Sequence, residues 1–276
     1  ILDSFARNPE IRSEFKVLVG KSDDILKITT PLEKISSENI RNSLENNNKY
    51  LGFANVVTYH ELISNVLNPN IELVLPVLSM KGNVNLGEDK ENISNTSVKA
   101  TSIIDGMAIF RNNKLIGYLT EEESLTYNIL RDSAKNFFIR TSGHDNEYIV
   151  HEIIRLSSKM EFDRNKNEMK ITLTGKSAIS EVNEKIDLEN LEEVSKLEKE
   201  LNQELKKMVE RSILSIQKKY NSDIFGFGDV IYKSYPKYFQ KIKDEFKQDG
   251  FQNMKVNVSV KIKGQEKGNL NRGVVK

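Results

Sequence analysis

The sequence predicts an α+β fold in which a mostly antiparallel sheet carries long helices on one face, preceded by a smaller mixed α/β block. Apolar residues recur every three or four positions over 188–216 with no Gly or Pro between them, which is typical of a long helix. Apolar and polar residues alternate over 254–262, which is typical of a strand with one buried face. The predicted order of the second block, β-β-α-β-β-α-α-β, favours helices laid on one face of such a sheet.

The first block mixes strands and helices. Residues 15–19 alternate in polarity before a glycine, which predicts a short strand. Thr58 and Glu61 form a capping-box pattern that opens a helix. Residues 71–78 form the next predicted strand, and Pro76 within it indicates a sheet edge or a bulge.

A change of composition at residues 81–97 predicts a domain boundary. Gly, Asn, Ser, Glu and Asp dominate there and leave few side chains to bury. We therefore expect the remainder of an N-terminal domain at 1–80, a linker at 81–97 and a C-terminal domain at 98–276. The chain starts at Ile1 without a charged or apolar leader, so we expect an excised or processed chain whose targeting segment is missing.

The second block opens with a hairpin. Asn112 and Asn113 separate two apolar runs, and asparagine tolerates the positive φ that a tight hairpin turn requires. Thr120 and Glu123 repeat the capping-box pattern and open a helix. Further strands are predicted at 148–162 and 169–182, helices at 188–220 and 236–250, and a final half-buried antiparallel strand at 254–262.

The long helix has two interpretations. Over 188–220 it would extend about 50 Å at ~1.5 Å per residue. Its apolar stripe suits packing across a sheet, which is the favoured interpretation. The same spacing also suits a coiled coil, so docking of a partner helix is the alternative.

The composition disfavours several functional classes. Hydrophobic residues make up 38% and charged residues 29% of the 276 residues, which is typical of a globular protein. The apolar runs are too short to cross a bilayer. Lys plus Arg number 41 and Asp plus Glu number 40, so nothing favours nucleic acid. The lack of cysteine excludes disulfides, thiolate zinc sites and cysteine nucleophiles.

Reactive residues are few and scattered. Ser142, His144 and Asp145 lie together, but a catalytic triad needs side chains that converge in space, which neighbours in one loop rarely do. His60 and His151 lack a second histidine at metal-ligand spacing and are interpreted as packed or surface residues. We therefore predict no catalytic residue, no metal and no cofactor.

A glycine-containing segment follows the long helix. Its two glycines, Gly226 and Gly228, do not make a dinucleotide-binding fingerprint, so we interpret the segment as a tight, aromatic-anchored connection. Exposed Phe and Tyr are common anchors at interfaces. The alternative is therefore a partner contact, and its candidate residues are Phe225, Phe227, Asp229 and Tyr238.

Lysines alternate along the last predicted strand. Lys255, Lys261 and Lys263 are interpreted as the solvated face of that strand, which also discourages aggregation at a sheet edge. Contact with anionic lipid headgroups is the alternative.

Short pieces in a characteristic order extend over nearly the whole chain. These pieces are residues 3–12, 17–20, 24–26, 74–76, 108–110, 115–117, 223–229 and Pro236. Through them the chain resembles the Ger(x)C family, the lipoprotein C subunits of spore nutrient-germinant receptors.

The resemblance implies a non-enzymatic subunit that works with two integral-membrane partners, the A and B subunits, in nutrient sensing and germination. It also implies a lipidated N-terminal cysteine, absent from this chain, that anchors the protein to the outer face of the inner spore membrane. The main alternative is an extracytoplasmic solute-binding domain that captures a small nutrient between its two blocks, with the linker as a hinge. An enzyme is a third and weaker alternative.

Overall fold

The computed structural model describes residues 14–21, 36–83, 99–142, 147–183, 186–187 and 190–264. Some predictions lie outside these ranges. They concern most of the linker, His144 and Asp145, the start of the long helix at Leu188, and two pieces of the family resemblance, residues 3–12 and 24–26.

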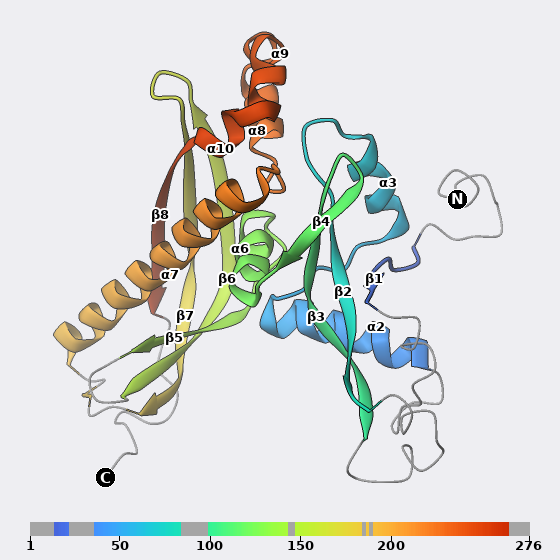
Figure 1. The fold of residues 1–276 in the computed structure, drawn as a ribbon. Coiled ribbons are helices and arrows are strands. Elements are labelled where there is room, and N and C mark those ends of the chain that lie inside the picture. Colours follow the sequence, from blue (N-terminus) through green and yellow to red (C-terminus); the bar gives the residue numbers. More distant parts are fainter. Residues whose placement is uncertain are drawn as a thin grey trace.

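The first sheet has the strand order β1-β2-β3-β4 (Figure 1). Its strands are β1 (Val19–Gly20), β2 (Val74–Gly82), β3 (Ala100–Arg111) and β4 (Lys114–Leu119). β1 pairs with β2 in parallel, whereas β2–β3 and β3–β4 are antiparallel. Because β2 comes from the first predicted block and β3 from the second, the two blocks share one sheet.

Local signals in this part of the chain are confirmed. Asn112 and Asn113 have φ of 50° and 62°, the positive values that the β3–β4 turn needs. The strand pairing shifts register between Pro76 and Leu78, so Pro76 marks a bulge. The helices beside this sheet are α2 (Ser36–Asn46), a π-helical turn η2 (Asn47–Leu51) and α3 (Tyr59–Leu67).

Both predicted capping boxes form. The Thr58 hydroxyl accepts from the Glu61 N–H, and the Glu61 carboxylate accepts from the Thr58 N–H, at the start of α3. Thr120 and Glu123 do the same at the start of α6 (Glu121–Leu130). Each box satisfies two backbone donors that a helix end otherwise leaves unpaired.

The second sheet has the order β5-β6-β7-β8 and carries the long helix α7 (Leu191–Tyr220) across one face (Figure 1). Its strands are β5 (Phe137–Ser142), β6 (Tyr148–Asp163), β7 (Glu168–Asn183) and β8 (Lys255–Gly264). Leu201, Leu205 and Val209 of α7 are fully buried in the same core cluster as Ile171 and Leu173 of β7. The apolar stripe of α7 therefore packs on the sheet, as the favoured interpretation predicts.

The remaining helices connect α7 to β8. They are α8 (Phe227–Ser234), α9 (Pro236–Glu245), a π-helical turn η3 (Phe246–Gly250) and the short α10 (Phe251–Asn253). α8 and α9 form a projection at one end of the molecule, beyond the end of α7 (Figure 1). Of the helices that the structure describes, none has the length and hydrophobicity needed to cross a bilayer.

Two strand predictions need correction. β8 pairs in parallel with β7, not antiparallel, because α7 to α10 return the chain to the end of the sheet where β7 begins. The alternation along β8 reports one buried face and carries no information on the direction of its neighbour. β5 was not predicted and pairs antiparallel with β6 at the sheet edge.

Candidate functional site

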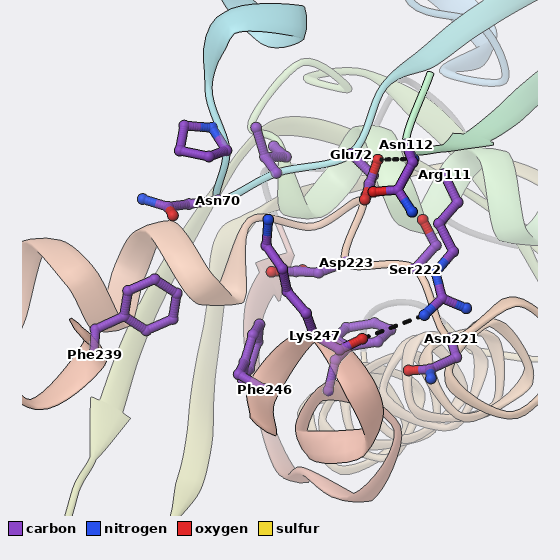
Figure 2. Close-up of a pocket in the computed structure, with 13 residues that line it drawn as sticks. Asn70, Glu72, Arg111, Asn112, Asn221, Ser222, Asp223, Phe239, Phe246 and Lys247 are labelled. Atoms are coloured by element: carbon purple, nitrogen blue, oxygen red, sulfur yellow. Dashed lines mark hydrogen bonds between the residues drawn. The ribbon is translucent and has the colours of Figure 1, made fainter. Parts of the chain in front are cut away.

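A small cavity lies where the two predicted blocks meet. Its volume is about 160 Å³, which is large enough for several water molecules or a small solute. Figure 2 shows that its walls come from the α3–β2 connection, the β3–β4 turn, the segment after α7 and the helices α9 to α10. The lining residues are Pro69, Asn70, Ile71, Glu72, Arg111, Asn112, Asn221, Ser222, Asp223, Phe239, Phe246, Lys247 and Phe251.

Asp223 is the buried titratable group of this cavity. Its carboxylate accepts hydrogen bonds from the backbone N–H of Gly226, Phe227 and Gly228, at 2.9, 3.0 and 2.7 Å. Burial raises its pKa to about 6, and these N–H donors with the Arg131 charge act in the opposite direction. A carboxyl with a perturbed pKa beside a cavity is typical of a functional site.

Charged groups of both signs line the same cavity. The Glu72 carboxylate accepts from the Asn112 N–H at 2.9 Å, and the Arg111 guanidinium donates to the Lys247 carbonyl at 3.3 Å (Figure 2). Neither Arg111 nor Lys247 forms an ion pair within the described residues. Asn221 Oδ1 is buried and accepts no hydrogen bond there either. The cavity thus combines two cations and one unused acceptor.

An aromatic wall completes the cavity. Phe239, Phe246 and Phe251 are 2%, 4% and 2% exposed and contact one another edge-on, with ring centroids 5.7 and 6.4 Å apart. This arrangement can hold a small solute that is polar at one end and apolar at the other. The residues that line the cavity are spread along the sequence from Pro69 to Phe251, so no single local sequence pattern predicts the cavity.

Two of the predicted partner-contact residues are in the core. Phe225 and Phe227 are 0% exposed, stack at 5.4 Å and both contact the Phe251 ring. Their side chains cannot reach a partner in this structure, so the expectation of exposed phenylalanine anchors is corrected. The tight, aromatic-anchored connection that we favoured is what the structure shows. Gly226 has φ of 83°, which explains the glycine at that position.

The other two predicted residues lie on the α8–α9 projection. Asp229 forms an i,i+4 ion pair with Lys233 at 2.8 Å. Tyr238 is half-buried, stacks on Phe162 at 6.1 Å and lies under the Arg164 guanidinium at 4.8 Å. Both therefore border the surface of the projection.

Exposed tyrosines mark that surface. Tyr232 and Tyr235 are 40% and 37% exposed, and with Tyr238 we call them the tyrosine patch. Tyr232 packs edge-on against Phe239 at 6.1 Å, and Tyr235 against Phe162 at 6.2 Å. These contacts hold the rings in place, so little side-chain entropy remains to be lost on binding.

The two described histidines occupy a packed position and a surface position, as the sequence interpretation predicts. His151 is buried, its Nε2 lies 3.2 Å from Thr141 Oγ1, and burial lowers its pKa to about 4. His60 is exposed on α3. Ser142 ends β5, and its predicted neighbours His144 and Asp145 lie outside the described residues. In the described part of the chain, no group of three or more His, Asp or Glu side chains could hold a metal ion.

The fold and these surfaces define an α+β protein with a small cavity and a helical projection that carries exposed tyrosines. The chain belongs to the spore germination B3/GerAC-like family: the C-terminal family model matches residues 105–268, and the N-terminal domain of spore germination proteins matches residues 1–80. The resemblance to Ger(x)C proteins is thereby confirmed.

Two curated relatives and one solved structure agree. Spore germination protein KC of Bacillus subtilis (strain 168) is 27% identical over 267 residues, covering 94% of this chain and 65% of the relative. Spore germination protein GerQC of Bacillus cereus is 22% identical, covering 75% of this chain and 54% of the relative. The chain thus spans about two thirds or less of these relatives. The crystal structure of the GerBC protein matches 96% of this chain and 73% of its own, with a TM-score of 0.65 at 16% identity, which shows a shared fold.

Proposed function

We propose that this protein is a non-enzymatic lipoprotein subunit of a spore nutrient-germinant receptor, which assembles with integral-membrane A and B subunits to trigger germination. An N-terminal lipid anchor outside this chain would hold it at the outer face of the inner spore membrane. Family membership supports a role in spore germination, and the names of the matched relatives denote germination proteins rather than enzymes.

The tyrosine patch is the observation that carries the assembly proposal. Tyrosine is enriched at protein interfaces because its ring supplies contact area and its hydroxyl a hydrogen bond. Tyr232 and Tyr235 are pre-positioned by Phe239 and Phe162 on a projecting helix pair (Figure 1). A partner that covers them gains buried aromatic area at a low entropic cost.

Photocrosslinking in spores tests this proposal. A photoreactive amino acid at position 232 is expected to trap the A or B subunit, because the proposed interface covers that side chain. The same amino acid at Tyr50, which is 51% exposed on η2, is the matched control and is expected to trap neither subunit. Equal yields at both positions would contradict docking through the tyrosine patch.

Solute binding in the cavity is the second candidate function, and the cavity's unpaired cations and aromatic wall favour it. The pairing of β2 with β3, from Val74 with Ile109 to Gly82 with Ala100, argues against a hinge at the predicted linker. A ligand that binds only the folded state raises the melting temperature. A saturable shift with one compound of a nutrient panel, lost in Arg111→Gln, would support solute capture, and silence across the panel would count against it.

A further inference from the structure

The second sheet has one covered and one open face. α7 lies over the covered face, where Asn202 bonds both backbone groups of Ile262 in β8, at 2.8 and 3.0 Å. The side chains of β8 that alternate with Ile262, from Lys255 to Lys263, point away from α7 and are exposed. Their cross-strand neighbours on β7 and β6 lie on the same open face. Among the described helices, α7 is the one that makes extensive contact with β8.

Charges balance on the half of the open face that lies toward the β6–β7 turn. Lys170 pairs with Asp163 at 2.7 Å, and Lys159 pairs with Glu161 at 2.9 Å. Lys255 lies in register with Glu168. Surface pairs of this kind contribute little to stability, but they leave this half nearly neutral.

The other half of the open face is basic. Lys176 of β7 and Lys263 of β8 are direct cross-strand neighbours, and Lys261 lies opposite Thr174. All three lysines are exposed, and none forms an ion pair in the described part of the chain. Like charges placed directly opposite destabilise a sheet, so this arrangement is unfavourable unless an anionic partner faces it.

The surroundings of these lysines indicate the kind of anionic partner. Thr172, Thr174 and Ser259 lie beside them, Ile154 of β6 lies opposite Lys176, and no aromatic side chain occupies these positions. The next carboxylate in register on β6, Glu152, lies opposite Ala178 and forms no ion pair with the three lysines in the described residues. Protein interfaces are depleted in lysine and enriched in aromatic residues, whereas anionic lipid headgroups attract lysines without fixed geometry.

We propose that this half of the open face, formed by Lys176, Lys261 and Lys263, docks on an anionic membrane surface. The proposal adds an orientation to the proposed function and rests on it only for the presence of a membrane nearby. It commits to a lipid surface rather than an acidic protein because ammonium and hydroxyl groups, with the aliphatic Ile154 and no aromatic anchor, make up this half of the face.

Vesicle co-sedimentation of the 276-residue chain tests the proposal, with no lipid anchor and no other subunit present. At low salt the chain is expected to bind vesicles that contain phosphatidylglycerol and not to bind vesicles of pure phosphatidylcholine. The bound chain is expected to dissociate as the salt concentration rises. The variant Lys176→Gln/Lys261→Gln/Lys263→Gln is expected to bind about 100-fold more weakly, at roughly fivefold per lysine.

The matched control removes three lysines from the opposite side of the sheet. Lys199→Gln/Lys207→Gln/Lys218→Gln changes exposed α7 residues without an ion pair in the described residues and lowers the net charge equally. It is expected to keep most of the affinity, and circular dichroism confirms that each variant is folded. Equal losses of vesicle affinity in the two variants would overturn the proposal. Binding of the parent chain to an acidic polypeptide but not to the anionic vesicles would overturn it as well. Neither outcome depends on assembly with the A and B subunits.

Discussion

At the scale of single residues, two buried groups respond to pH in opposite directions. Burial lowers the pKa of His151 to about 4, so between pH 4 and 6.5 the unfolded chain binds more protons and stability rises with pH. Burial raises the pKa of Asp223 to about 6, so between pH 3.8 and 6 the folded chain binds more protons and stability falls as pH rises. Each effect is about 3 kcal/mol at ~1.36 kcal/mol per pKa unit, and the two nearly cancel.

Single substitutions should expose each response. His151→Gln keeps a partner for Thr141 and is expected to lose about 2–3 kcal/mol, relative to the parent protein, between pH 4 and 6.5. Asp223→Asn keeps one acceptor for the α8 N–H groups and is expected to gain a similar amount, relative to the parent protein, between pH 3.8 and 6. Urea unfolding at a series of pH values measures both. Curves that run parallel to the parent protein's would contradict the burial of these groups.

At the scale of elements, α7 makes more contact with the second sheet than any other described helix. Leu205 lies in the centre of its buried stripe and is 0% exposed, whereas Leu214 is 49% exposed. Leu205→Ala is therefore expected to lower the free energy of unfolding by about 2–5 kcal/mol. Leu214→Ala is the matched control and is expected to cost under ~0.5 kcal/mol, which urea unfolding resolves. Similar losses in the two variants would mean that α7 does not pack as described.

Sequence patterns predict elements better than their pairing. Capping boxes at Thr58 and Thr120, the Asn112–Asn113 turn and the α7 stripe are local, and all of them are confirmed. The direction of β8 is not local, because the helices between β7 and β8 decide it. β5 was not predicted because the polarity of its residues does not alternate: Phe138 is apolar but exposed, and Thr141 is polar but buried.

At the scale of the whole molecule, the shared first sheet couples the two predicted blocks. β3 pairs with β2 from Ala100 to Ile109, so a fragment of residues 98–276 would expose that edge of β3 and lose the packing of Val74 beside its cross-strand partner Ile109. The full chain is therefore expected to unfold in one transition and the fragment at a lower urea midpoint or not to stay soluble. Equal midpoints would support independent domains at the predicted boundary.

The cavity shows why a site of this kind is hidden from sequence. Its lining side chains come from four separate segments, and only the glycine-containing segment around Asp223 gave a local signal. The tyrosine patch was found only in part, through Tyr238, because the exposure of Tyr232 and Tyr235 depends on how α8 and α9 project from the sheet. Phe225 and Phe227 were predicted as partner contacts because they are aromatic, but both are buried in the core.

The most direct test is the recovery of the membrane subunits with the Tyr232→Ala/Tyr235→Ala variant of the full-length protein, purified from spores. If contact through the projection drives assembly, recovery of the A and B subunits should fall by at least ~30-fold, since a single interface hot spot already contributes about 2 kcal/mol. Nutrient-triggered germination should fall with them, while Tyr50→Ala leaves both unchanged. Undiminished recovery of A and B with the double variant would contradict the account.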